Sequence, residues 1–257
     1  MVPVTVDGEQ VRLAVITYRP AGNGPFPTLI FHHGSTGRGT DPSLFARPNN
    51  PRPTVDWFVA RGWAVLLPAR RGRGGSEGRY DEGFDTNRSY GYTCETSLSI
   101  AGADRALRDI EAITPVLLTQ PFVDRSRVAV GGQSRGGILS IAWSGKHPEM
   151  RAAINFVGGW MGAACSTAST INQTLFKRGA AYGQPTLWLY GDNDSYYPLS
   201  HSRSNFEAYR AAGGKGSFNE YKPAAGQNGH GISFVPSLWD ATMEAYLSQL
   251  GLPARVN

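Results

Sequence analysis

Gly132-Gln133-Ser134-Arg135-Gly136 is the stretch that decides the fold of this chain. It fits the pattern Gly-x-Ser-x-Gly, in which a serine lies on a tight turn between a strand and a helix. Residues 127–131 before it are typical of a buried strand, and residues 137–143 after it are typical of a helix. Small residues flank the serine because only glycine leaves room around so sharp a corner. We therefore expect the Ser134 hydroxyl to be held above the edge of a sheet.

An acid and a histidine follow this serine along the chain. The apolar run 185–190 leads into Gly191-Asp192-Asn193-Asp194, and Gly229-His230-Gly231 comes later. A serine hydroxyl is a weak nucleophile until a base takes its proton, and neutral imidazole can accept one near pH 7. A carboxylate can fix the tautomer of that imidazole. These residue types in this order predict catalytic roles for Ser134, for His230 and for one acid, either Asp194 or Asp192.

His230 is the preferred base among the five histidines. It lies between glycines in a loop after the last expected strand, where it can reach back over the sheet. His32 and His33 precede the nucleophile, His147 falls at an expected helix end, and His201 is expected on a helix surface.

The order serine, acid, histidine resembles that of the α/β-hydrolases, not that of trypsin-like or subtilisin-like enzymes. Upstream, the apolar run 28–31 leads into His32-His33-Gly34-Ser35-Thr36-Gly37, which resembles the oxyanion loop of that superfamily. Within the superfamily, the chain resembles dienelactone-hydrolase-like esterases and the catalytic domains of prolyl-oligopeptidase-type peptidases. The resemblance implies that Asp194, three residues after the glycine that ends the strand, is the acid, with Asp192 as the alternative. It also implies an oxyanion hole formed by the backbone N–H groups of Ser35 and Arg135.

Alternating strands and helices predict an α/β fold, with a mostly parallel sheet and helices on both faces. The expected strands are 2–6, 11–18, 28–32, 63–68, 128–132, 152–157, 186–190 and 217–221, and the expected helices are 55–62, 96–113, 137–143, 199–212 and 237–250. The resemblance implies the α/β-hydrolase fold, with about eight strands and no large cap domain. We expect residues 1–257 to form one domain, in which residues 160–182 are a small, irregular, lid-like insertion.

Three residues are candidates for contact with the substrate. Trp160 follows an expected strand and Tyr196 adjoins Asp194, so both are candidates for the lining of an acyl or aryl pocket. The Arg135 side chain is expected either to turn to solvent or pair with a carboxylate, or to bind a substrate carboxylate or carbonyl.

A net charge of +5 is too small to indicate a nucleic-acid-binding protein. The tract from Arg70 to Gly78 can be taken for an RNA-binding Arg-Gly segment, but it directly follows a strand, where α/β-hydrolases commonly carry such a turn. No apolar run of about 18 residues is present, so no membrane span is expected. No signal peptide is visible, although a leader can have been removed, and the compartment stays open. Cys94 and Cys165 are either two separate thiols or a disulfide, which would indicate a periplasmic or secreted protein.

The resemblance implies a serine hydrolase that cleaves small-molecule carboxylic esters, with short to medium acyl or aryl groups, through an acyl-enzyme. No metal or organic cofactor is expected. True dienelactone hydrolases use a cysteine nucleophile where this chain has Ser134, which favours a general esterase. The alternatives are a peptidase or amidase of the prolyl-oligopeptidase type, an acyltransferase, and a non-catalytic binding protein.

Overall fold

The computed structural model describes residues 1–255, and a seven-stranded sheet in the order β3-β5-β4-β6-β7-β8-β9 forms its centre. Only the β3–β5 pair is antiparallel, and the other neighbours are parallel. The strands are β3 (Val15–Tyr18), β4 (Phe26–His32), β5 (Ala64–Pro68), β6 (Val123–Gln133), β7 (Ala152–Phe156), β8 (Thr186–Gly191) and β9 (Gly216–Tyr221). The central strands are continuous apolar runs because helices cover both of their faces.

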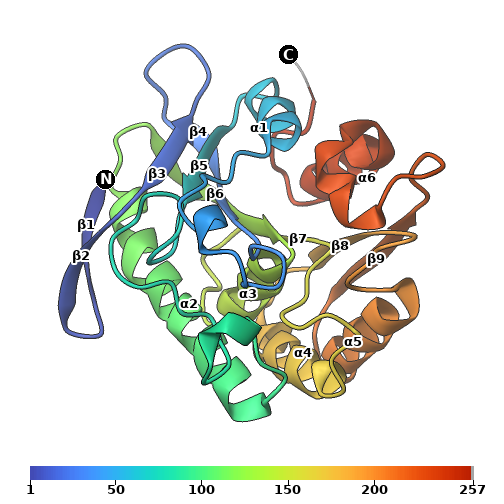
Figure 1. Cartoon of the computed structure of the whole chain (residues 1–257). Helices are drawn as coiled ribbons and strands as arrows, with labels where there is room; N and C mark the ends of the chain where they lie inside the picture. Colours follow the sequence, from blue (N-terminus) through green and yellow to red (C-terminus); the bar gives the residue numbers. More distant parts are fainter. Residues whose placement is uncertain (256–257) are drawn as a thin grey trace.

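Helices lie on both faces of this sheet, as Figure 1 shows. Helices α1 and α6 contact each other on one side, and α2, α3, α4 and α5 form a contiguous row on the other. Their bounds are α1 (Arg52–Val59), α2 (Thr96–Leu118), α3 (Arg135–Ser144), α4 (Ala168–Lys177), α5 (Leu199–Ala211) and α6 (Pro236–Gln249). The predicted α/β architecture is confirmed. No helix within residues 1–255 is both long and apolar enough to cross a membrane.

The main sheet has seven strands where about eight were expected. The first segment, β1 (Val2–Val6), pairs only with β2 (Glu9–Leu13) in a separate hairpin that packs against α2. The expected strand 11–18 is divided at Ala14, because the chain leaves the hairpin there and continues as β3 beside β5. The run of alternating apolar residues did not reveal this change of partner.

The segment 160–182 is not irregular, contrary to the expectation, because it contains α4. Ile171, Leu175 and Phe176 are buried on one side of this helix, at helical spacing. The helix packs between α3 and α5. Residues 157–167 before α4 contain no helix or strand, and part of this stretch borders the site described below.

The expected helix 96–113 continues through Pro115 to Leu118. Glu95 caps its beginning, because its carboxylate accepts the N–H groups of Ser97 at 2.9 Å and Leu98 at 2.7 Å. Pro115 has no N–H group and so removes one hydrogen bond from the helix. The buried side chain of Leu117 in the last turn offsets this loss by packing in the core.

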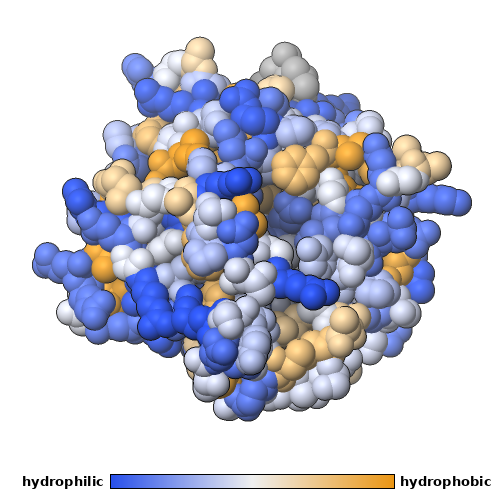
Figure 2. Space-filling view, viewed as in Figure 1, coloured by the Kyte–Doolittle hydropathy of each residue, from blue (hydrophilic) through white to orange (hydrophobic). Residues whose placement is uncertain are grey.

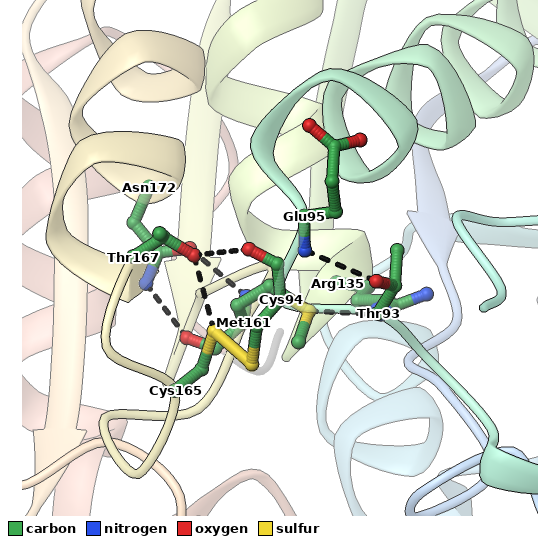
Figure 3. Close-up of a disulfide and its surroundings, with 8 residues drawn as sticks. All are labelled: Thr93, Cys94, Glu95, Arg135, Met161, Cys165, Thr167 and Asn172. Carbon is green, nitrogen blue, oxygen red and sulfur yellow. Dashed lines mark hydrogen bonds between the residues drawn. A yellow bond between two sulfur atoms is a disulfide. The ribbon is translucent and has the colours of Figure 1, made fainter.

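Cys94 and Cys165, whose pairing the sequence left open, form a disulfide across a sequence separation of 71 residues. Figure 3 shows the bridge between the start of α2 and the loop before α4. Thr167 reinforces the junction, because its hydroxyl donates a hydrogen bond to the Cys94 carbonyl. The bridge therefore ties together two loops that border the same cavity.

The turn at Ser134 depends on close packing of β6 and α3 against β4. A Cβ atom at Gly136 would lie 1.9 Å from the carbonyl oxygen of His32, and one at Gly132 would lie 2.6 Å from that same oxygen. Ser134 itself has φ 56° and ψ −123°, a region that costs a non-glycine residue about 1–3 kcal/mol. Because residues 132 and 136 are glycines, β6 and α3 can pack closely against β4, and this packing holds the strained Ser134 in place.

Gly136→Ala is expected to destabilise the protein by about 3 kcal/mol or more, because the new methyl group overlaps backbone that cannot move aside. Chemical denaturation measures the loss. Gly183→Ala is the matched control, because a Cβ at that position meets nothing within 4 Å. Equal stability of the two variants would contradict the packing argument.

Replacing both cysteines by serine is expected to lower the free energy of unfolding by about 2–4 kcal/mol, since the bridge restricts the unfolded chain. Thermal melts of the oxidised protein, the reduced protein and the double variant measure this effect. The reduced protein should melt like the double variant. A melting temperature that neither reduction nor substitution changes would show that the bridge contributes nothing.

Candidate active site

The predicted site residues converge at the carboxyl edge of the parallel strands, where α/β sheets bind ligands. Ser134 follows β6, and Asp194 lies three residues beyond the end of β8. The loop that starts at His33 follows β4. His230 lies in a short 3-10 helix, Gly229–Phe234, after β9. Four separate strand ends thus bring these residues together, and Ser134, His230 and the loop after β4 border one cavity, while Asp194 lies buried behind His230.

Asp194 and His230 are directly hydrogen-bonded. The Nδ1 atom of His230 lies 2.9 Å from Oδ2 of Asp194, whose side chain is fully buried. The other carboxylate oxygen accepts the N–H groups of Tyr196 at 2.8 Å and Tyr197 at 3.0 Å. Since Nδ1 donates to the carboxylate, Nε2 can accept a proton. Asp192, the alternative acid, is exposed, and its side chain accepts a hydrogen bond from the N–H of Asn193.

Ser134 borders the same cavity as His230, and only 6% of it is exposed. Tyr197 borders the cavity beside it, and its hydroxyl donates to the carbonyl of Gly159 at 2.8 Å. Burial raises the pKa of Tyr197 above its usual value, so this phenol stays protonated. Within residues 1–255, no direct hydrogen bond joins Ser134 to His230, and such bonds often form only when substrate closes the site.

The loop after β4 borders this cavity through Gly34 and Ser35. The carbonyl of Gly34 accepts hydrogen bonds from Nδ1 of His33 at 2.8 Å and from Nη1 of Arg73 at 3.1 Å. Gly34 itself packs against Ser134, since a Cβ there would lie 3.0 Å from the serine Cβ. The loop is therefore held directly beside Ser134.

His33 holds this loop as a neutral donor. The N–H of Arg70 donates to its Nε2 at 3.1 Å, so the proton of the ring lies on Nδ1 and is donated to Gly34. Burial and the charges of Arg70 and Arg73 hold the pKa of His33 well below its usual value. The first histidine, His32, is also buried, and burial and Arg70 lower its pKa to about 3.

The Arg135 side chain is buried, unlike either a solvent-exposed or a substrate-binding arginine. Its guanidinium donates to the carbonyls of Glu82 at 2.7 Å and Trp160 at 3.1 Å. It also lies between two aromatic rings, 3.7 Å from the centre of Tyr92 and 4.1 Å from that of Trp160. Of the sequence-based alternatives, pairing with a carboxylate describes Arg135 best, because its Nη1 lies 3.7 Å from Oε2 of Glu82. As the first residue of α3, Arg135 has a backbone N–H with no acceptor inside the helix.

Glu82 is a buried acid that pairs with both Arg70 and Arg135. Burial alone raises the pKa of Glu82, but the charges of Arg70, Arg135 and Arg73 hold it below its usual value. Arg70 binds the carboxylate through Nε at 2.5 Å. The basic tract after β5 therefore supplies buried ion pairs rather than a surface for RNA.

A chain of hydroxyl groups leads from Glu82 to the loop after β4. Tyr80 donates to the carboxylate at 3.1 Å, and its oxygen lies 2.6 Å from that of Tyr92. Since Tyr80 points its proton at Glu82, Tyr92 donates to Tyr80 and is left as an acceptor. The N–H of Thr36 donates to Tyr92 at 3.3 Å.

We call the space around Ser134 the site cavity, which has a volume of about 570 Å³. Trp160 and Tyr196, the two predicted substrate contacts, both border it. The remaining lining residues are Gly34, Ser35, Gly37, Arg38, Asn49, Tyr90, Tyr92, Cys94, Gln133, Ser134, Arg135, Met161, Gly162, Ala164, Cys165, Ser195, Tyr197, His230 and Phe234. Elsewhere on the face in Figure 2, hydrophobic residues are scattered among hydrophilic ones instead of forming one large patch.

Sequence reasoning missed several residues of this cavity. Tyr92 and Arg38 lie in loops whose course no periodic pattern predicts. Tyr197 was not missed, because it adjoins the expected acid and this proximity placed it near the expected site. His201, expected on a surface, is half-buried and lies 2.9 Å from the amide of Asn172. Within residues 1–255, no group of three or more His, Cys, Asp or Glu side chains is placed to hold a metal ion.

Solved structures of similar fold span nearly the whole chain. The acetyl xylan esterase from Paenibacillus sp. R4 is 19% identical, with a TM-score of 0.66 over 95% of this chain and 83% of that one. The Pyrococcus furiosus esterase Pf2001 is 15% identical, with a TM-score of 0.65 over 96% and 88%. Est1E from Butyrivibrio proteoclasticus is 15% identical, with a TM-score of 0.60 over 97% and 98%. At these identities the likeness establishes the α/β-hydrolase fold.

The family model for X-Pro dipeptidyl-peptidases of family S15 matches residues 7–181, which is more than half of the chain. The match includes β4, the loop that follows it, and the strained turn at Ser134. Together with the α/β-hydrolase fold, it shows that this chain belongs to the S15 family of X-Pro dipeptidyl-peptidases.

Proposed function

We propose that the protein is a serine hydrolase that cleaves carboxylic esters of small molecules, with Ser134 as nucleophile, His230 as base and Asp194 as its orienting acid. The observation that carries the proposal is the 2.9 Å hydrogen bond from His230 to the buried Asp194, at the edge of the cavity that Ser134 borders. That bond leaves Nε2 of His230 free to accept the serine proton.

The reaction proceeds through an acyl-enzyme. Oγ of Ser134 attacks the ester carbonyl while His230 takes its proton, and the carbonyl oxygen becomes an oxyanion. The N–H groups of Arg135 and Ser35 stabilise this oxyanion. When the tetrahedral intermediate collapses, His230 protonates the departing alcohol. A water molecule, deprotonated by His230, then releases the acid and restores Ser134.

Trp160 and Tyr196 form part of the wall against which the substrate packs. The cavity volume suits a small molecule, and these aromatic side chains offer apolar surface to an acyl or aryl group. Tyr196 also lies beside the base, with its ring centre 4.8 Å from that of His230.

A peptidase is the second candidate, because the family takes its name from one. Release of a dipeptide from a chain end requires recognition of a positively charged α-amino group, for which proteins use carboxylates. Among the lining residues of the site cavity there is no aspartate or glutamate. The lining therefore favours ester cleavage over removal of dipeptides.

Ser134→Ala is expected to lower kcat by about a thousandfold or more on p-nitrophenyl esters from acetate to decanoate, since it removes the nucleophile. Circular dichroism checks that the variant is folded. Turnover by wild type of X-Pro p-nitroanilides, but of none of the esters, would replace the esterase proposal by the peptidase. Ester turnover that survives the substitution would exclude Ser134 as nucleophile.

Tyr92→Phe is expected to lower kcat about tenfold while KM changes less than about twofold, because the Thr36 N–H loses its acceptor and the oxyanion loop loosens. The ring that stacks on Arg135 is kept. Tyr90→Phe is the control, because Tyr90 borders the same cavity but is 70% exposed. Wild-type kcat in Tyr92→Phe, or an equal loss in both variants, would argue against this role.

A further inference from the structure

We infer that the site cavity selects esters that carry a carboxylate, and that Arg38 on the oxyanion loop binds this anionic group. The inference rests on the proposed ester hydrolysis and adds a class of substrate to it. It depends on the charge of the cavity and on the state of its two arginines.

The charged side chains that border the cavity are cationic. Arg38 and Arg135 line it and no carboxylate does, and because Glu82 pairs with Arg135, the uncompensated charge is that of Arg38. Arginine matches a carboxylate well, because its planar fork can donate two parallel hydrogen bonds. The same charges repel a substrate with a free ammonium group. A negatively charged substrate is therefore the electrostatic complement of this cavity.

Of the two arginines, only Arg38 is free to bind a ligand. The guanidinium of Arg135 is buried, sandwiched between two rings and bonded to protein carbonyls. Arg38 is exposed, and within residues 1–255 its side chain takes part in no hydrogen bond or ion pair. The sequence-based hypothesis of a carboxylate-binding arginine was thus attached to the wrong residue.

The backbone fixes the position from which Arg38 reaches the cavity. Its carbonyl accepts the N–H of Tyr92 at 3.0 Å. A Cβ at Gly91 would lie 2.1 Å from that carbonyl oxygen, so only glycine allows the contact. The arginine also lies three residues after Ser35, whose N–H we assign to the oxyanion hole. A group bound by Arg38 is therefore held near the reacting carbonyl by a constrained loop.

The test compares matched esters with Arg38→Gln. In the acyl arm the pair is mono-p-nitrophenyl adipate and p-nitrophenyl hexanoate, and in the alcohol arm it is p-acetoxybenzoate and its methyl ester. We expect Arg38→Gln to raise KM about tenfold or more for the acid of at least one pair, with less than about twofold change for the neutral partner. The affected arm shows which side of the ester carries the carboxylate.

Arg47→Gln is the control variant. Arg47 is exposed, lies nine residues further along the chain and does not border the cavity. It removes the same unit of charge, so it should leave both members of each pair unchanged. Equal effects of Arg38→Gln on acidic and neutral esters, or an equal effect of the two variants, would overturn the inference while ester hydrolysis itself stands.

Binding to the inactive Ser134→Ala protein tests the inference without turnover. Calorimetry should show that monomethyl adipate binds at least about tenfold more tightly than dimethyl adipate, and that adding Arg38→Gln removes the difference. Equal affinity for the two compounds would reject the anionic subsite. If wild type hydrolyses no ester, the proposed function fails, and this measurement still decides whether the cavity selects carboxylates.

Discussion

The strained backbone of Ser134 is the constraint on which the rest of the site depends. At φ 56° and ψ −123° the residue holds its hydroxyl at the edge of the sheet. It remains there because Gly132 and Gly136 bring α3 and β6 into contact with the carbonyl of His32. The same contact places the end of β4, and with it the oxyanion loop, beside the serine. The proposed nucleophile and this loop are therefore positioned by one packing arrangement.

A cluster of buried charges supports the other side of the cavity. Glu82 is 2% exposed, and burying a carboxylate is costly unless cations and hydrogen bonds compensate. Arg70 and Arg135 provide this compensation, and each also binds a carbonyl of the surrounding loops. The charges thus act less as a source of net stability than as a means of fixing loops that have no regular secondary structure.

The polarity of the cavity connects its architecture with its proposed chemistry. Because the acids of this region are buried in ion pairs, as Glu82 is, or bonded to His230, as Asp194 is, none is left to face the substrate. The free side chains are an arginine and aromatic rings. A member of a family named for peptidases can in this way present a cavity suited to an anionic ester.

The sequence by itself determined the strand-turn-helix at Ser134 and the alternation of strands and helices, because these follow from local periodicity and from glycine. It also predicted that Asp194 and His230 would meet, since both follow strands of one parallel sheet, and the structure brings them together. Their catalytic roles stay a prediction. Only the tertiary structure decided that Ala14 separates two strands, that Arg135 is buried, and that Tyr92 and Arg38 border the cavity. These features depend on contacts between loops distant in the chain, where side-chain periodicity carries no information about the partner.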